Sequence, residues 1–292
     1  MSWYAGFEHI VREGEVLAPF TDFRLGGPAS FFAEPTSVDE LSGLLAAARA
    51  ESIPVRLLGG GSNVLVPDEG YDGLVLQITA PAFTQIQVDG TRVTAGGGSK
   101  LVHLISTTAR EGLSGLEQLA GIRGTVGGAL KGNAGTGSGD IGQWTESVSV
   151  MTVAGEVLDR SRDEIHFSYR QSDLDEAVIL AGVFQLDQDD AREVTRRIQK
   201  LWIMKRASHP MGEQGSGSVF KDQGGVSAAS LIEQAGFKDA QVGGATVFES
   251  QANYIVVGDG ATSADVRRLI DKLREGVLDQ LEVELQLQVD LW

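Results

Sequence analysis

Apolar side chains recur along the chain with two spacings, which predict a mixture of short strands and amphipathic helices. Leu41, Leu44 and Leu45 keep helical spacing, and Ser37 with Glu40 forms the capping-box signature of a helix start. Similar patterns predict further helices over residues 99–110, 189–207, 226–235 and from about 264 onward. Short apolar runs predict strands at residues 30–34, 54–58, 64–66, 84–88, 91–95, 147–153, 156–159, 177–186, 253–257 and 283–292.

The final ten residues alternate regularly between apolar and polar side chains. Glu284, Gln286, Gln288 and Asp290 would share one face of a strand, and the intervening residues would share the other. This alternation predicts a single half-buried strand over residues 283–292.

Residues 121–139, GIRGTVGGALKGNAGTGSG, contain eight glycines in nineteen positions. So dense a run lets backbone N–H groups approach a large planar or anionic ligand closely, at a cost in conformational entropy. A flexible Gly/Ser linker is the alternative, but Ile122, Val126 and Leu130 place apolar side chains in the run, which solvated linkers lack. The segment therefore indicates a wall of a cofactor site.

Three consecutive glycines, Gly59 to Gly61, stand between two predicted buried strands. Their N–H groups could point the same way and hold a pyrophosphate. No Gly-Lys-Ser/Thr follows and no helix opens directly after the turn, so this is neither a Walker loop nor a GxGxxG dinucleotide fingerprint. A glycine hairpin without a ligand is the alternative interpretation.

A second small-residue stretch, GSGSVFK at residues 215–221, leaves the backbone around Ser218 accessible. A hydroxyl there could act as a general acid if a neighbouring group stabilised the alkoxide. The alternative is a serine that merely forms a turn, as most serines beside glycine do.

Composition narrows the possible classes of protein. With 42% hydrophobic and 22% charged residues among 292, the chain is globular and long enough for two or three lobes. A net charge of -16 argues against a nucleic-acid partner. The absence of cysteine excludes disulfides and fits a reducing cytoplasm, and the N-terminus shows no secretory signal. The four histidines are scattered, so no metal site is expected.

Six segments stand in the order found in one enzyme family. They are TDFRLGGPA (21–29), LLGGGSNVLVPDEGYDGLVL (57–76), LAGIRGTVGGALKGNAG (119–135), YRQS (169–172), GSVFK (217–221) and GGATVFESQANYIV (243–256). In these segments the chain resembles the UDP-N-acetylenolpyruvoylglucosamine reductases, flavin enzymes of peptidoglycan precursor synthesis, and specifically their compact type.

The resemblance implies an α+β fold with a two-lobed FAD-binding domain of the vanillyl-alcohol-oxidase type and a C-terminal α+β substrate domain. We expect FAD-binding lobes at residues 1–80 and 81–207 and the substrate domain at 208–292. The implied reaction uses NADPH to reduce FAD and then transfers a hydride from flavin N5 to an enolpyruvyl UDP-sugar, giving UDP-N-acetylmuramate. Cell-wall biogenesis, cell shape and cell division would depend on that product.

The resemblance also implies roles for individual residues. Arg170 of YRQS would stabilise the enolate, Ser218 would deliver the proton, and Gln288 stands at the position of the family's catalytic glutamate. Lys205, Arg206, Lys221 and Lys238 are candidates to meet phosphate groups, with ordinary solvated charges as the alternative. The residues expected to bind FAD are Gly59, Gly60, Gly61, Ser62, Asn63, Val64 and Leu65 at the pyrophosphate, and Gly121, Ile122, Gly124, Thr125, Val126, Gly127, Gly128 and Asn133 along the flavin and its ribityl tail.

The chain departs from the family pattern at several positions. Arg123 replaces a usual proline, Asp222-Gln223 replaces Asn-Pro, Gln251 replaces histidine, and Gly137 replaces a frequent tyrosine. Two alternatives therefore remain: an FAD oxidoreductase acting on another sugar or lactone, and a catalytically idle flavin or sugar-nucleotide binding protein, which Gln288 favours.

Overall fold

The computed structural model describes residues 2–208, 210 and 215–292. Within them the chain forms two compact units. Unit 1 comprises Met1–Glu15, Ser30–Gly60 and Asp72–Ile203, and unit 2 comprises Val16–Ala29, Gly61–Tyr71 and Met204–Trp292. The division into domains at 1–80, 81–207 and 208–292 stays a prediction.

The first sheet has four strands in the order β1-β2-β5-β3, with β3 parallel to β5. Its strands are β1 (Val11–Val16), β2 (Pro28–Ala33), β3 (Val55–Leu57) and β5 (Tyr71–Leu76). The helix α1 (Val38–Ala50) buries Leu41, Leu44 and Leu45 in a core shared with this sheet, as its apolar spacing predicts. Ser37 caps α1 as expected, but the Glu40 carboxylate accepts from Thr36, one residue before the cap.

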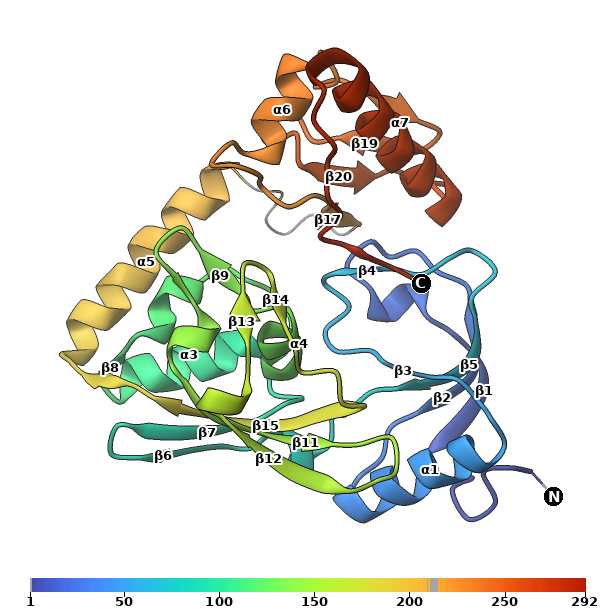
Figure 1. The fold of residues 1–292 in the computed structure, drawn as a ribbon, viewed down its shortest axis with the longest axis vertical. Coiled ribbons are helices and arrows are strands. Elements are labelled where there is room, and N and C mark those ends of the chain that lie inside the picture. The colour runs from blue at the N-terminus through green and yellow to red at the C-terminus, as the bar shows by residue number, and fades with distance from the viewer. Residues whose placement is uncertain (1, 209, 211–214) are drawn as a thin grey trace. The chain divides into compact units, whose positions relative to one another are not determined.

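The second sheet of unit 1 has five strands in the order β12-β11-β15-β7-β6. Figure 1 shows α3 and α4 on one face of this sheet. Along the central strand β15, Ile179 and Phe184 face the core that contains α3 and α4, whereas Val178 and Leu180 face the core that contains α1. The strand is buried on both faces, which explains its continuous apolar run. The elements are β6 (Ile86–Asp89), β7 (Arg92–Gly96), β11 (Thr145–Met151), β12 (Val157–Ser161), β15 (Val178–Gln185), α3 (Leu101–Arg110) and α4 (Val126–Lys131).

Short elements connect these layers. They are α2 (Pro81–Thr84), β8 (Leu113–Ser114), β9 (Gly135–Thr136), β10 (Gly139–Asp140), β13 (Phe167–Ser168), β14 (Gln171–Ser172) and β16 (Asp187–Gln188), with 3₁₀ turns η1 (Ala18–Phe20), η2 (Leu116–Leu119), η3 (Ile141–Gln143) and η4 (Arg162–Glu164). The long helix α5 (Ala191–Ser208) follows β16.

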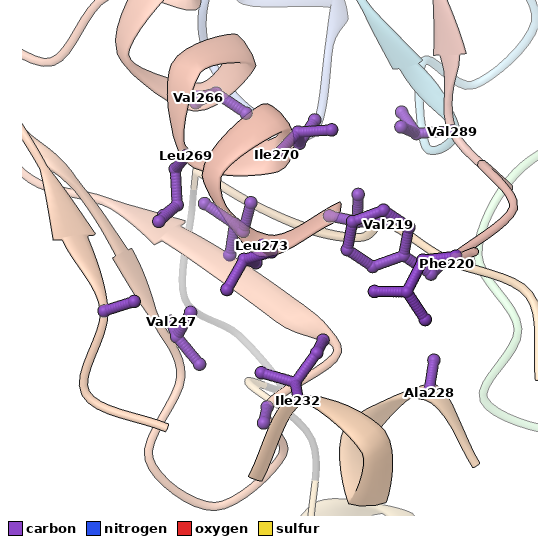
Figure 2. Packing of buried hydrophobic residues seen from close by; sticks show 14 of the residues in the cluster. Val219, Phe220, Ala228, Ile232, Val247, Val266, Leu269, Ile270, Leu273 and Val289 are labelled. Atoms are coloured by element: carbon purple, nitrogen blue, oxygen red, sulfur yellow. The ribbon is translucent and has the colours of Figure 1, made fainter. Parts of the chain in front are cut away.

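Unit 2 is built around a four-stranded antiparallel sheet in the order β17-β20-β19-β18. Its core joins this sheet to α6 and α7, and Figure 2 shows Val219, Phe220 and Val289 in the same cluster as Ile270 and Leu273 of α7. The elements are β17 (Ser216–Ser218), α6 (Ala228–Gln234), β18 (Gln241–Val242), β19 (Ala245–Val247), β20 (Tyr254–Val257) and α7 (Ser263–Leu281).

The last strand differs from its prediction. Residues 283–292 do not form one continuous strand: Leu287 makes an isolated bridge to Phe220, and only β21 (Asp290–Leu291) is regular, paired in parallel with β4 (Val64–Leu65). Two consecutive amides, those of Gln288 and Val289, donate to the same Val219 carbonyl oxygen. This irregularity breaks the alternation of side chains, so Gln288 and Asp290 do not share a face by strand periodicity.

Candidate active site

The glycine turn at residues 59–63 joins β3 to β4, whose partners are different strands. β3 pairs with β5 and β4 pairs with β21, so the turn does not form a hairpin, and its role in holding a ligand stays a prediction. Two loop carbonyls are fixed by donors: Gly59 O accepts from Gln77 Nε2 at 3.1 Å, and Gly61 O accepts from the Asp22 amide at 2.9 Å.

The amides of this turn are largely unused within the protein. No described residue accepts a hydrogen bond from the N–H of Gly59, Gly60, Gly61 or Asn63. Gly60 and Asn63 are exposed, so a ligand can reach this turn, and several adjacent free amides form an anion-binding nest. The turn therefore fits the pyrophosphate of FAD.

Glycine is required in this turn for a reason that the sequence does not reveal. A Cβ on Gly60 would lie 2.8 Å from the Cα of Gly124, and a Cβ on Gly61 would lie 2.0 Å from the Phe20 carbonyl oxygen. Gly61 also has a positive φ of 64°. The expected reason was close approach of a ligand, whereas at these two positions neighbouring backbone already excludes a side chain.

The glycine-rich segment contains a helix, α4, which was not predicted from the sequence. Thr125 caps α4, and its hydroxyl accepts from the Gly128 amide. The amides of Val126 and Gly127 donate to Ser99 O and Gly97 O at 2.9 and 2.8 Å. The Val126 side chain is fully buried in the core. Because the first amides of α4 are already bonded, this helix start is suited to line a cofactor rather than to hold its phosphates.

Hydrogen bonds bring the end of the glycine-rich segment together with the YRQS motif. Asn133 Nδ2 donates to Ser168 O at 2.8 Å, and its Oδ1 accepts from the Gly142 amide at 3.1 Å. Ser172 Oγ donates to Lys131 O at 2.9 Å. The Asn133 side chain is buried and satisfied by the protein, so its role is to hold these segments together, and its place among the FAD-binding residues stays a prediction.

Arg170 occupies the tight turn between β13 and β14. Its φ of 58° lies in the left-handed region, an uncommon conformation for a residue with a side chain. Its Nη1 donates to Gly135 O at 2.7 Å. Its Nε is buried and has no acceptor among the described residues. Such backbone strain combined with an open buried donor is typical of a functional site.

Ser218 ends β17 and pairs with Tyr254 of β20. Asn253 holds this part of the chain: its Nδ2 donates to Phe220 O at 2.8 Å, its Oδ1 accepts from the Phe220 amide at 2.9 Å, and its Nδ2 lies 3.4 Å from Ser218 Oγ. Asn253 was not among the site residues predicted from the sequence. The only signal for it is a polar residue inside the QAN motif, directly before a buried strand.

Gln288 lies beside the serine segment of unit 2, because its amide donates to Val219 O at 2.8 Å. Its side chain is half-buried and makes no hydrogen bond within the described part of the chain. Glu284 is not a substitute for it, since the Glu284 side chain is 76% exposed and lies 3.4 Å from Arg274 Nη2. Asp290 is exposed, and its carboxylate accepts from Trp292 Nε1 at 3.1 Å.

The remaining site candidates have different surroundings. Gly121 and Ile122 form the turn after η2, and Ile122 packs against the core of unit 1. Lys205 and Arg206 end α5, Lys238 is exposed after α6, and the Lys221 amide donates to Gln286 O at 2.9 Å. His209 lies outside the described residues.

Comparisons with known proteins agree with this architecture. Residues 209–292 match the profile of the UDP-N-acetylenolpyruvoylglucosamine reductase C-terminal domain, and residues 29–161 match an FAD binding domain. The UDP-N-acetylenolpyruvoylglucosamine reductase of Rhodopirellula baltica is 37% identical over 97% of this chain and 93% of its own length. The UDP-N-acetylenolpyruvoylglucosamine reductase of Moorella thermoacetica is 39% identical over 98% of this chain and 95% of its own length.

A solved structure gives the same result. The crystal structure of UDP-N-acetylenolpyruvylglucosamine reductase from Thermus caldophilus matches with a TM-score of 0.83 and 33% identity, over 97% of this chain and 99% of that one. Fold and domain matches thus define an FAD-dependent oxidoreductase. The chain belongs to the UDP-N-acetylenolpyruvoylglucosamine reductase family.

Family membership confirms the predicted α+β fold and the cofactors FAD and NADPH. The roles of the individual site residues stay predictions. No helix in the described ranges combines the length and the apolar character needed to cross a membrane.

Proposed function

We propose that this protein uses NADPH to reduce UDP-N-acetylglucosamine enolpyruvate to UDP-N-acetylmuramate, in the cytoplasmic synthesis of peptidoglycan precursors. The observation that carries the proposal is Arg170, a strained arginine with an open buried Nε that is tied through Nη1 to Gly135 of the glycine-rich segment. The relatives named for this reaction supply the substrate class.

Some residues of the chain would bind the cofactor, and others would stabilise charge on the substrate. The four free amides of the turn at residues 59–63 would hold the pyrophosphate of FAD, and the start of α4 would line the cofactor. When bound, FAD supplies the hydride chemistry. The protein has to orient the substrate, exclude water and stabilise the charge that develops on it.

Arg170 would stabilise the enolate that forms when the enolpyruvyl double bond accepts a hydride. Its Nη1 is already fixed by Gly135, so the fork is oriented before the substrate binds. The open Nε donor needs an anionic or carbonyl acceptor, and the substrate carboxylate would provide one.

Ser218 would deliver the proton to the enolate carbon. The Asn253 amide lies 3.4 Å from Ser218 Oγ and would support the hydroxyl as it loses its proton. Gln288 would donate an amide hydrogen bond near this site, but unlike a glutamic acid it cannot pass a proton onward.

One observation favours a second candidate, a flavin-binding protein without this activity. The family resemblance puts Gln288 in the place of the catalytic glutamate, and the Glu284 carboxylate lies beside Arg274 and does not replace it. An FAD oxidoreductase acting on another sugar or lactone would be the third outcome.

The test begins with the visible spectrum of the purified protein with added FAD, followed by NADPH consumption with and without the enolpyruvyl UDP-sugar. The proposal predicts a flavin spectrum and NADPH consumption that depends on the substrate. Flavin reduction by NADPH that molecular oxygen, but not the substrate, reverses would favour an oxidase of another specificity. A flavin that NADPH does not reduce would favour the idle protein.

A further inference from the structure

Asn63 of the glycine turn is tied to the C-terminal segment by two hydrogen bonds. Its side-chain Nδ2 donates to Gln288 O at 2.9 Å, and its own carbonyl oxygen accepts from the Asp290 amide at 2.9 Å. The first of these bonds links positions 225 residues apart, and the atoms of both bonds belong to unit 2. The Asn63 side chain is therefore directed to the last segment, while its N–H stays free among the turn amides.

Gln288 is held on its other side by the serine segment. The amides of Gln288 and Val289 both donate to Val219 O, at 2.8 and 3.2 Å, and Leu287 bridges Phe220. The backbone of Gln288 thus lies between the residue after Ser218 and the cofactor turn. Since the Gln288 side chain has no hydrogen-bond partner among the described residues, these backbone bonds are what fix its position.

We propose that Asn63 is a positioning residue that couples the FAD-binding turn to the proton-transfer residues Ser218 and Gln288. Ordering of the turn amides around the cofactor pyrophosphate also orders Asn63, whose side chain holds the Gln288 carbonyl and whose backbone carbonyl holds the Asp290 amide. The protein then assembles its proton-transfer site only when the cofactor turn is occupied. This inference rests on the proposed function for its catalytic consequence but not for the coupling itself.

Hydrogen exchange followed by mass spectrometry tests the coupling without any turnover. In the native protein, FAD should slow amide exchange at Gln288 and Asp290 by about 5-fold or more, the low end of typical coupling between sites. In Asn63→Ala, FAD should still protect residues 59–62 but no longer residues 288–289, whose shared peptide carries the carbonyl that Asn63 Nδ2 holds. The Asp290 amide bonds to the backbone of residue 63, so its protection should remain in this variant. Asn63→Asp keeps the shape of the side chain but lacks the amide donor, so it should give the same result as Asn63→Ala. It replaces the alanine variant in this test if that variant folds poorly.

Gln223→Ala is the matched control. Gln223 Nε2 donates to Glu284 O at 2.8 Å, so this variant also removes a bond from a side-chain amide to a backbone carbonyl of the same segment. FAD should protect residues 288–290 in Gln223→Ala as in the native protein. Loss of protection at residues 288–289 in the control as well, or its persistence there in both Asn63 variants, would overturn the coupling.

The two half-reactions supply the catalytic readout. With FAD saturating, Asn63→Ala should be reduced by NADPH within about twofold of the native rate, while reoxidation by the enolpyruvyl substrate slows by about 10- to 100-fold, the scale of small misplacements. A positioning role for Asn63 would be contradicted if both half-reactions slowed equally. It would also be contradicted if Gln223→Ala slowed reoxidation and left reduction unchanged, as Asn63→Ala is expected to do. If the native protein is not reoxidised by this substrate, the proposed function fails while the exchange experiment still decides the coupling.

Discussion

Gly60 and Gly124 meet backbone to backbone, so that a Cβ on Gly60 would lie 2.8 Å from the Gly124 Cα. Real Cβ atoms essentially never come so close to another carbon, so any side chain at residue 60 must displace one of the two segments. Both segments belong to the predicted FAD site. The contact therefore sets the distance between the pyrophosphate turn and the glycine-rich segment within unit 1.

Gly60→Ala should weaken FAD binding. The added methyl group moves the turn amides away from the pyrophosphate, and the loss of one hydrogen bond to a charged group, about 1.5–3 kcal/mol, corresponds to roughly a 10- to 150-fold rise in Kd. Quenching of flavin fluorescence on binding measures it. Gly258→Ala is the control, because it lies outside the predicted FAD site and a Cβ there meets only the Gly244 carbonyl oxygen, at an ordinary 3.8 Å. Equal Kd values for the two variants would show that the contact between residues 60 and 124 does not matter for FAD.

Arg170→Lys should slow reoxidation of the reduced flavin by the enolpyruvyl substrate by about 10²-fold or more, because lysine keeps the charge but loses the fixed fork. Reduction by NADPH should change little. Rapid mixing under anaerobic conditions separates the two steps. Arg162→Lys is the control, since Arg162 likewise donates to a backbone carbonyl, that of Ile165 at 2.9 Å, within the same unit. If Arg170→Lys is reoxidised by the substrate at the native rate, Arg170 does not stabilise the enolate.

Gln288→Glu should raise turnover and introduce a step in the acid limb of the pH–rate profile that the native protein lacks. A glutamic acid can both donate a hydrogen bond and pass on a proton, whereas the glutamine amide can only donate. Glu284→Gln should leave turnover nearly unchanged, because Glu284 is exposed and lies beside Arg274. If Gln288→Glu leaves turnover unchanged and Glu284→Gln abolishes it, Glu284 is the acid.

Glu40 should make stability depend on pH below about 4.5. The Thr36 amide, His9 and the Thr36 hydroxyl lower the pKa of Glu40 to about 2 from a usual 4.5. A carboxylate with a lowered folded-state pKa stabilises the protein above its unfolded-state pKa, and this stabilisation is lost as the pH falls through the folded-state value. The melting temperature of Glu40→Gln should therefore lie below native at pH 7 and approach it near pH 2. A difference that stays constant between pH 7 and pH 2 would exclude the ionised carboxylate as the cause.

Much of the fold could be predicted because local signals agree with packing. Ser37 caps the helix that buries Leu41 and Leu44, and the continuous apolar run at β15 is buried on both faces. The last strand was predicted wrongly because alternation alone cannot reveal two successive amides sharing the Val219 carbonyl. The helix α4 was missed because glycine has a low helix propensity, and its N-terminal bonds to Gly97 and Ser99 are tertiary.

The candidate site, like the fold, could be predicted only where local sequence patterns are sufficient. Motifs identified Arg170 and Ser218, but no sequence pattern indicates that Nη1 of Arg170 bonds to Gly135 or that the Asn63 side chain bonds to Gln288. Such partners depend on contacts between distant segments, and they decide which donors remain open for a ligand.

The mass of the product tests the proposed function most directly. The purified protein, loaded with FAD, is incubated with NADPH and the enolpyruvyl ether of UDP-N-acetylglucosamine without oxygen, and the sugar nucleotide is then analysed by mass spectrometry. The proposed reaction predicts that it gains the mass of two hydrogen atoms, in amounts equal to the NADPH consumed. Recovery of unchanged substrate from protein whose flavin NADPH has reduced would contradict it.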